Sequence, residues 1–584
     1  MPELTLRLPG MLDPRPHATP RVIPLAPRPP SLDGKSLVCF DNGKLHPRYG
    51  HNAIIFQTVS QRLQSHYGVR ACQQLSRDLL PLQLHSVRAL ADEIMQLGAD
   101  GVLLALCDSG VTAYTVVLAW ELERHGVPTV TLCAGQTIYL AAAMSLPVMP
   151  GLPLSQVRIL RHTSPADIAA EALWVLGEVV EGFTTAPALL QQQFLDKFAP
   201  EQHAIPTDAA GALHLWPSRT IPLASPQTSE IVYDPSDDLE TLYTTLCDNG
   251  MSDGLPVMPP TQPRVEAMLR FTDRLPHDIL IPHCFPSGMP LTVITLAINA
   301  VMAGCRPEYF PILLTAAQAM AEPQYRLMQA TITSHPAGNA ILVSGPLAQE
   351  ISLASAGGCL GPGFRANMTI GRALNLSLLN VGRALPDRAD LSTIGSPAEL
   401  SLCCAEHVQA SPWTPFHLDV FDADTTSVTV LKCESPHNVL DHLSTSPEGL
   451  LRGIADVAAT LGGNNAYVPA ELLVLLNPEH AQLIHAAGWG KSDVQRYVFE
   501  HARNPRHLLT GRGITPVHPA TFATLDEIPV VPSPEHVLVF VVGTNGPHSM
   551  VGLPWGYSRA VTKAVCLRDG RPARQLRDFH APEC

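Results

Sequence analysis

The segment that most constrains the fold runs over residues 103–133, LLALCDSGVTAYTVVLAWELERHGVPTVTLC. An apolar run ends at a small polar turn, a long helical pattern follows, and a second short apolar run closes the segment. Two buried strands joined by a helix in this way are typical of a parallel sheet. The segment therefore predicts a strand–helix–strand unit whose polar turn lies at the carboxyl end of the first strand.

The same alternation of strand and helix signals extends over residues 33–185. It predicts an α/β fold in which a doubly wound parallel sheet carries helices on both faces. Open sheets of this kind collect ligands at the carboxyl ends of their strands. Two polar turns are expected there, DNGK at 41–44 and CDSG at 107–110.

Length and proline distribution predict four parts of the chain. With 584 residues, the chain is long enough for more than one domain. Proline-rich stretches without periodicity mark an extended, partly mobile arm and a connector. A second run of apolar helices and strands then continues to the end. The expected parts are a Pro-rich N-terminal arm at 1–32, an α/β domain at 33–199, a linker at 200–236, and a larger α/β or α+β domain at 237–584.

Composition narrows the function classes. A net charge of −14 disfavours general nucleic-acid binding, which requires a basic face. The sequence contains no uninterrupted apolar run of about 18 residues, the length that a membrane-spanning helix requires. The first residues also show no export signal. A cytoplasmic location is therefore expected. The 13 cysteines include no C-x-x-C pair, which disfavours the simplest zinc and thioredoxin sites. We expect a small-molecule substrate, no nucleic-acid or membrane partner, and a chain compatible with a homodimer; no cofactor is indicated.

Three parts of the N-terminal sequence resemble the UGSC-type (seleno)proteins: DNGK at 41–44, the turn at 106–112, and ELERHGVPTVTLC at 121–133. That family is named for a selenocysteine- or cysteine-Gly-Ser-Cys motif, and its domain is similar to a component of glycine, sarcosine and betaine reductases. The resemblance covers roughly residues 35–160. It implies an α/β domain with a redox turn at the end of a strand.

The resemblance also implies that this turn has lost its redox residues. Alignment on ELER places Asp108 where the family has its redox-active selenocysteine or cysteine, and Ser109, Gly110 and Val111 at the Gly, Ser and Cys positions. Cys107 lies one position too early. Without the two sulfurs the turn cannot form a disulfide couple, although its N–H groups can still bind an anion. We expect a degenerate redox turn made of Cys107, Asp108, Ser109 and Gly110.

A glycine-rich stretch at 357–373, GGCLGPGFRANMTIGRA, is the main candidate for substrate binding. Glycines let backbone N–H groups approach a ligand, and the arginines add positive charge near a helix start. The alternative is a tight turn with structural ion pairs. Residues 253–554 also resemble a long module that accompanies UGSC-type domains, but that resemblance implies no chemistry. The expected substrate-binding residues are Gly361, Gly363, Arg365, Asn367 and Arg372, together with Arg306 and Trp413.

Three histidines of the larger domain lie on turns that flank predicted strands. Histidine titrates near neutral pH and serves as a general acid or base, although a single histidine is often structural. The expected catalytic residues are His335, His417 and His548, with Asp253 and Glu406 as carboxylate partners. No metal is assigned, and a site made of the three histidines and a carboxylate is the alternative.

The expected function is therefore an enzyme that acts on a small, anionic metabolite by acid/base chemistry in the larger domain. The family context suggests C–S or C–N bond or redox chemistry in a biosynthetic pathway, as in a lyase or an oxidoreductase. One alternative is a thiol-dependent oxidoreductase that uses Cys107, with Cys133 or Cys359 as its resolving thiol. Another is a non-catalytic binding or scaffold subunit.

Overall fold

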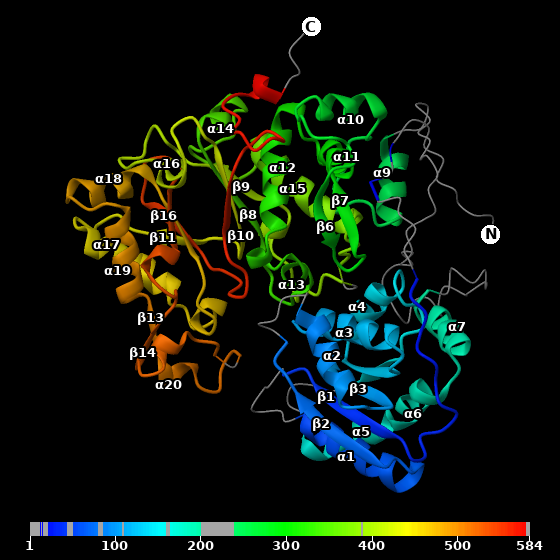
Figure 1. The fold of residues 1–584 in the computed structure, drawn as a ribbon. Helices are drawn as coiled ribbons and strands as arrows, with labels where there is room; N and C mark the ends of the chain where they lie inside the picture. Colours follow the sequence, from blue (N-terminus) through cyan, green and yellow to red (C-terminus); the bar gives the residue numbers. More distant parts are fainter. Residues whose placement is uncertain are drawn as a thin grey trace.

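The computed structural model describes residues 12, 14–15, 22–43, 51–79, 86–107, 110–158, 164–199, 239–386, 389–514 and 516–579. Figure 1 shows a parallel-sheet domain, drawn in blue and cyan, below a larger region drawn in green to red. The linker expected at 200–236 lies outside the described residues. Among the described helices, none is both long and apolar enough to cross a bilayer.

The N-terminal domain contains one five-stranded sheet in which every pair is parallel, in the order β2-β1-β3-β4-β5. Residues of the inner strands are mostly apolar and buried, as expected for a sheet covered on both faces. The strands are β1 (Ser36–Asp41), β2 (Ala71–Ser76), β3 (Gly101–Cys107), β4 (Thr129–Ala134) and β5 (Leu154–Val157).

Helices cover both faces of this sheet, which confirms the predicted doubly wound α/β fold. One buried core joins the sheet to α2, α3, α4 and α7, and another joins it to α1, α5 and α6. The helices are α1 (His51–Tyr67), α2 (Ser86–Gln96), α3 (Thr112–Arg124), α4 (Thr137–Ser145), α5 (Pro165–Trp174), α6 (Leu176–Thr184) and α7 (Pro187–Phe198).

The carboxyl ends of β1 and β3 meet, as the sequence predicts for the two polar turns. Asn42, which directly follows β1, is fully buried, and its side-chain amide donates to Leu106 O at 2.8 Å and to Thr115 Oγ1 at 3.1 Å. The strand order reverses at β1, because β2 and β3 lie on its two sides. Ligands bind at such a reversal in doubly wound sheets.

Residues 22–32 of the N-terminal arm are attached to the domain, whereas most of residues 1–21, for which partial mobility is expected, lie outside the described residues. Arg28 forms an ion pair with Glu123 of α3 at 2.7 Å, and both side chains are almost completely buried. Glu123 also accepts hydrogen bonds from Ala26 N at 2.8 Å and from Thr129 N at 2.6 Å. The ion pair and these hydrogen bonds replace the water contacts that the carboxylate loses on burial.

Two four-stranded sheets form the centre of the larger region, in the orders β17-β10-β8-β9 and β11-β16-β12-β15. Each sheet has two antiparallel pairs and ends in one parallel pair, β8 with β9 and β12 with β15. The strands are β8 (Gly338–Ser344), β9 (Leu402–Ala405), β10 (Ser427–Cys433), β11 (His437–Leu440), β12 (Leu472–Leu476), β15 (Val537–Val541), β16 (His548–Gly552) and β17 (Val561–Ala564), with smaller ribbons of β6 (Ile279–Cys284) with β7 (Met289–Thr292) and β13 (Arg503–Pro505) with β14 (Glu527–Pro529).

The two sheets pack face to face, with helices on both outer surfaces, so the region has four layers (Figure 1). One core lies between the sheets, and each sheet shares a further core with its own helices. The helices are α9 (Leu239–Asp248), α10 (Gln262–Leu269), α11 (Val293–Ala303), α12 (Phe310–Met320), α13 (Leu327–Ile332), α14 (Pro346–Glu350), α15 (Arg365–Asn380), α16 (Phe416–Val420), α17 (Pro447–Ala458), α18 (Pro478–Ala486), α19 (Lys491–His501) and α20 (Arg506–Leu509).

The larger region contacts the N-terminal domain through apolar side chains. Phe285, Met328, Ile332 and Ala389 belong to the same buried core as α3 and α4. This contact lies beside the beginning of α3, directly after the predicted redox turn. The two parts therefore share a core at the carboxyl edge of the parallel sheet.

Candidate functional site

A buried polar cluster lies where the parallel strands β8 and β9 end. Ser344 is the last residue of β8, and Glu406 directly follows β9, with its backbone N donating to Val343 O at 2.8 Å. His407 N donates to Val541 O at 2.8 Å, which joins this edge to the end of β15 in the second sheet. Carboxyl ends of parallel strands are the usual place for ligands in α/β proteins.

Ser344 connects the two predicted catalytic residues of this cluster. Its hydroxyl donates to Glu406 Oε2, and its Oγ lies 2.8 Å from His417 Nδ1. A hydroxyl has one proton, so a Ser344 that donates to Glu406 accepts the Nδ1–H of His417. This arrangement leaves the lone pair on Nε2, and among the described residues no hydrogen bond reaches that atom. The geometry is that of an oriented general base.

Burial sets the charge states of the cluster. Glu406 is only 4% exposed, and burial raises the pKa of its carboxyl, although the hydrogen bond from Ser344 and the charge of Lys491 oppose the rise. Burial, followed by the nearby Lys491, lowers the pKa of His417. Neutral imidazole is therefore the favoured form near pH 7, and neutral imidazole accepts protons.

Lys491, the first residue of α19, supplies a positive charge next to this base. Its Nζ lies 2.9 Å from Asp419 Oδ2 and 3.9 Å from Glu406 Oε1. The same Nζ lies 5.9 Å from the centre of the Phe416 ring. About 14% of the lysine side chain is exposed, so Lys491 lies between the buried cluster and the surface.

The structure pairs Asp253, predicted as a catalytic carboxylate, with Arg372, predicted as a substrate-binding residue. Arg372 Nε and Nη2 donate to the two carboxylate oxygens of Asp253 at 2.6 and 2.8 Å. Arg372 also donates to Leu255 O and Pro256 O. A bidentate pair of this kind satisfies both charged groups, so its observed effect is to fix the 253–256 loop to α15.

The glycine-rich loop begins beside the buried cluster, and Asn367 holds it in place. The Asn367 side chain accepts from Ala354 N and donates to Ala354 O and Cys359 O, each at 2.9 Å. Ala405 N donates to Ala354 O at 3.1 Å, so the segment that leads into the loop is joined to the residue before Glu406. Asn367 is therefore a support for the loop.

The remaining residues of the predicted binding loop lie at its outer end. Gly363 has φ +117°, a conformation that favours glycine. Gly361 N donates to Gly358 O at 2.8 Å in a tight turn. Arg365, the first residue of α15, is exposed, and its Nε donates to Gly304 O at 2.8 Å. The outer end of the loop is therefore a structured surface turn, and its role in substrate binding stays a prediction.

The other predicted residues have separate environments. Arg306 is exposed at the start of a short 3-10 helix (Pro307–Tyr309), and Trp413 Nε1 donates to Trp489 O at 3.0 Å. His335 Nε2 lies 2.7 Å from Glu434 Oε1, and the exposed His548 contacts Asn438 Oδ1 at 2.8 Å. The structure thus brings His417 and Glu406 together, but not the three histidines. In the described part of the chain, no group of three or more candidate ligands could hold a metal ion.

Only part of the predicted redox turn lies within the described residues, because Asp108 and Ser109 are outside them. Cys107 ends β3, and Gly110 precedes α3. Cys107 and Cys133 are in register across β3 and β4, and both are fully buried. Cys359 instead contacts Cys404 in the larger region. Reactive cysteines are usually accessible, so the burial of Cys107 opposes a role as a nucleophile.

The comparisons with known proteins agree with the sequence resemblance. Residues 10–185 match the model of the UGSC family. Residues 10–185 are therefore similar to the UGSC family, and we call the N-terminal domain the UGSC domain. A search of curated proteins found no match, and a search of solved structures also found none. The match includes the ELER segment, whose Glu123 binds Arg28, so this part of the UGSC domain fixes the N-terminal arm.

A pocket of about 200 Å³ lies between the UGSC domain and the larger region. Tyr114 of α3 lines it from the UGSC side, and His283, Arg326 and Gln329 line it from the other side. Burial raises the pKa of Tyr114 to about 12, while the nearby charge of Arg326 lowers it. The pocket adjoins the helix that follows the degenerate turn, which makes it a candidate for anion binding separate from the buried cluster.

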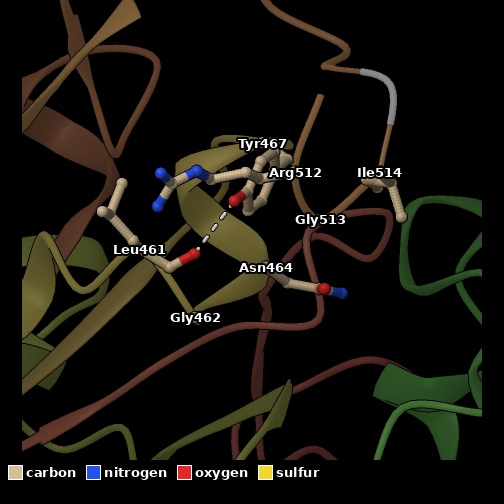
Figure 2. Close-up of a pocket in the computed structure, with 7 residues that line it drawn as sticks. All are labelled: Leu461, Gly462, Asn464, Tyr467, Arg512, Gly513 and Ile514. Atoms are coloured by element: carbon tan, nitrogen blue, oxygen red, sulfur yellow. Dashed lines mark hydrogen bonds between the residues drawn. The ribbon is translucent and has the colours of Figure 1, made fainter. Parts of the chain in front are cut away.

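Figure 2 shows another pocket, of about 340 Å³, which no residue of the buried cluster lines. Asn464 and Tyr467 line it, and Arg512 extends across it. Tyr467 donates to Leu461 O at 3.0 Å, and Asn464 donates to Trp555 O at 2.9 Å. Both polar side chains thus hydrogen-bond to the wall of the pocket. The described residues that line this pocket include no histidine and no carboxylate, unlike the buried cluster.

Ser344 and Lys491 are functional candidates that the sequence analysis missed. Ser344 stands in VSGP, a serine at the end of a buried strand directly before Gly-Pro. Lys491 stands in GWGKSD, a lysine at a predicted helix start. Position at a strand end or a helix start is the signal that identifies both, whereas a search for G-x-S-x-G does not find Ser344.

Proposed function

We propose that the chain is an enzyme that transfers a proton to or from a small, anionic metabolite, with His417 as the acid/base group. The observation that carries the proposal is the hydrogen-bonded series Glu406–Ser344–His417, buried at the ends of β8 and β9. The series orients one imidazole and leaves its Nε2 available. Such a positioned base typically contributes 10²- to 10⁴-fold to a rate.

In the proposed mechanism, His417 Nε2 takes a proton from the substrate and becomes positively charged. Nδ1–H then donates more strongly to Ser344, whose hydroxyl donates to Glu406, so the carboxylate stabilises the imidazolium ion. Lys491 lies beside the same cluster, 3.9 Å from Glu406, and attracts the anionic group of the substrate. After bond cleavage, the imidazolium returns its proton to the leaving group or to water.

The resemblance of the N-terminal domain to the UGSC family suggests which substrates to test first. Removal of a proton next to a leaving group breaks a C–S or C–N bond without an external oxidant, as a lyase does. The sulfur and nitrogen chemistry of the reductases that the domain resembles makes thioethers and amines with a carboxylate the first compounds to test. The proposal also includes a cytoplasmic location and a homodimer, which fractionation and size-exclusion chromatography can examine.

The test incubates the full chain with a pool of small carboxylates and phosphates and follows each compound by mass spectrometry. Wild type is compared with His417→Asn. His480→Asn is the matched control, because His480 is equally buried and its Nδ1 also lies 2.8 Å from a serine, Ser549, but its Nε2 is already bound to Asp441 O at 3.2 Å. We expect a compound that wild type and His480→Asn consume and that His417→Asn leaves intact. Equal consumption by all three, or by none, would contradict the proposal.

A further inference from the structure

A buried lysine in the larger region has an environment unlike that of an ordinary cation. Lys432 lies on β10 and is 9% exposed. Lys432 lies opposite Asn339 of β8, and Val430, two residues earlier on β10, lies opposite Ile341. Val430 and Ile341 belong to the core that the sheet shares with its helices, and side chains two residues apart share a face. The lysine side chain therefore enters the helix-covered face of the sheet.

Among the described residues, no hydrogen bond or ion pair reaches Lys432 Nζ, and the acidic groups near it act only through longer-range electrostatics. Asp390 and Glu399 are near enough to raise its pKa, but burial has the larger effect and lowers the pKa overall. Burial of a charge without a partner costs free energy. A lysine relieves that cost by losing its proton, which an arginine does not do in proteins.

Polar side chains lie on the residues next to Lys432 on this face of the sheet, Asn339 opposite it on β8 and Glu434 two positions further along the chain. Asn339 accepts a hydrogen bond from the Tyr325 hydroxyl and donates to Asn375 of α15 at 2.9 Å. Two residues after Lys432, Glu434 contacts His335 Nε2 at 2.7 Å. His335 Nδ1 is buried and has no hydrogen-bond partner in the described structure. An apolar core does not need this set of groups, whereas a site for a small polar molecule does.

Composition adds an independent argument. The chain contains 38 lysines and arginines, of which only six are lysines. Arginine is thus the usual cation of this protein, and lysine is used at few positions. A buried lysine in such a chain indicates a requirement for an amine that can lose its proton, and a neutral amine is a nucleophile.

We propose that Lys432 is a nucleophilic amine that forms an imine with a small aldehyde or ketone. The amine nitrogen attacks the carbonyl carbon, the C–N bond forms, and the carbonyl oxygen becomes a hydroxyl group. The first nitrogen proton forms that hydroxyl group, and the hydroxyl then leaves as water with the second nitrogen proton, which gives the neutral imine. The electrons balance without an oxidant or a reductant. This site is separate from the His417 cluster, and neither proposal depends on the other.

The test is reductive methylation of the full chain with formaldehyde and cyanoborohydride, followed by peptide mass spectrometry of all six lysines. An ordinary lysine with a pKa of about 10.4 is neutral in only about one molecule in 2,500 at pH 7. We expect Lys432 to be methylated at least about five times faster at pH 7 than Lys35 and Lys563, which are ion-paired and about one-third exposed. This preference should shrink at pH 9.5, because the surface amines then lose their protons.

Lys432→Arg keeps the positive charge and cannot form an imine, so its melting temperature reports separately whether the side chain is needed for the fold. In that variant the rates at Lys35 and Lys563 should stay unchanged. The proposal is overturned if Lys432 in the folded chain reacts more slowly at pH 7 than the two surface lysines, or reacts only after unfolding in urea. Either result would identify Lys432 as a closed structural residue.

Discussion

The Nδ1 atom of His417 lies 2.8 Å from Ser344 Oγ, and the same hydroxyl donates to the buried carboxylate of Glu406. Three residues that are up to 73 positions apart in sequence thus form one hydrogen-bonded series at the carboxyl edge of a four-layer fold. Phe416 N, directly before His417, also donates to Glu406 at 2.8 Å. This second bond fixes the backbone of α16, so the imidazole is held from two sides.

Ser344→Ala should lower turnover of the substrate by about 10- to 100-fold while the chain stays folded. The substitution removes the hydroxyl that orients His417, and loss of such a supporting contact typically costs about that factor. The measurement is kcat with the compound found by the metabolite comparison. Ser549→Ala, which removes the equivalent bond to His480, should leave kcat unchanged. An equal loss in both variants would show that the effect of Ser344 is only on folding.

The free energy of unfolding of Glu406→Gln should rise relative to that of wild type as the pH increases from 4 to 7. Burial raises the pKa of Glu406 above the unfolded value of about 4.3. The folded chain therefore holds this proton more tightly than the unfolded chain, and stability from the group is lost as the pH rises through the folded pKa. Glutamine does not titrate. Urea unfolding of both proteins at pH 4, 5.5 and 7 measures the difference, and a constant or decreasing difference would contradict the raised pKa.

Arg28→Ala should destabilise the UGSC domain by about 3–5 kcal/mol, because it leaves Glu123 buried without its counter-charge. The Arg28–Glu123 distance is 2.7 Å, and the side chains are 1% and 0% exposed. Arg571→Ala is the matched control, since Arg571 and Asp569 are also 2.7 Å apart but lie on the surface. That variant should unfold like wild type in urea. Similar midpoints for all three proteins would show that the buried pair is unimportant for the domain.

Iodoacetamide at pH 7.5 should alkylate Cys72 first and should reach Cys107 only after unfolding. Cys72 is partly exposed on the edge strand β2, and the hydrogen bond from Cys39 lowers its pKa to about 7. Cys107 is fully buried, and burial raises the pKa of its neighbour Cys133. Peptide mass spectrometry after short exposure measures both sites. Comparable labelling of Cys107 in the native chain would favour the thiol-dependent alternative.

The architecture of the UGSC domain was predictable because its signals are local. The inner strands β1, β3 and β4 are short, mostly apolar runs, and each is followed by a helix, as the crossovers of parallel strands require. The edge strand β2, ACQQLS, is polar and mostly exposed and carries no such signal. Strands such as HVLVFVVG and TSVTVLKC in the larger region were equally visible. Their assembly into two stacked sheets was not, because pairing of β10 with β8, or of β12 with β16, joins segments distant in sequence.

The candidate site was predictable only in its parts. His417 was identified as a histidine on a turn that flanks predicted strands, and Glu406 as a carboxylate partner; in the structure both side chains contact Ser344. Asp253 and Arg372 were equally plausible by residue type, but they satisfy each other in an ion pair. Sequence alone does not distinguish a free charged group from a paired one, since the pairing depends on contacts made 119 residues apart.

The pH dependence of kcat/KM for the identified substrate tests the role of His417 most directly. A neutral imidazole is required, and burial lowers its pKa below the ordinary value of about 6.5. The account predicts that kcat/KM of wild type falls on the acid side with an apparent pKa below 6.5, and that this limb is absent from the residual activity of His417→Asn. The same acid limb in His417→Asn, or a wild-type profile without one, would contradict the assignment of His417 as the base.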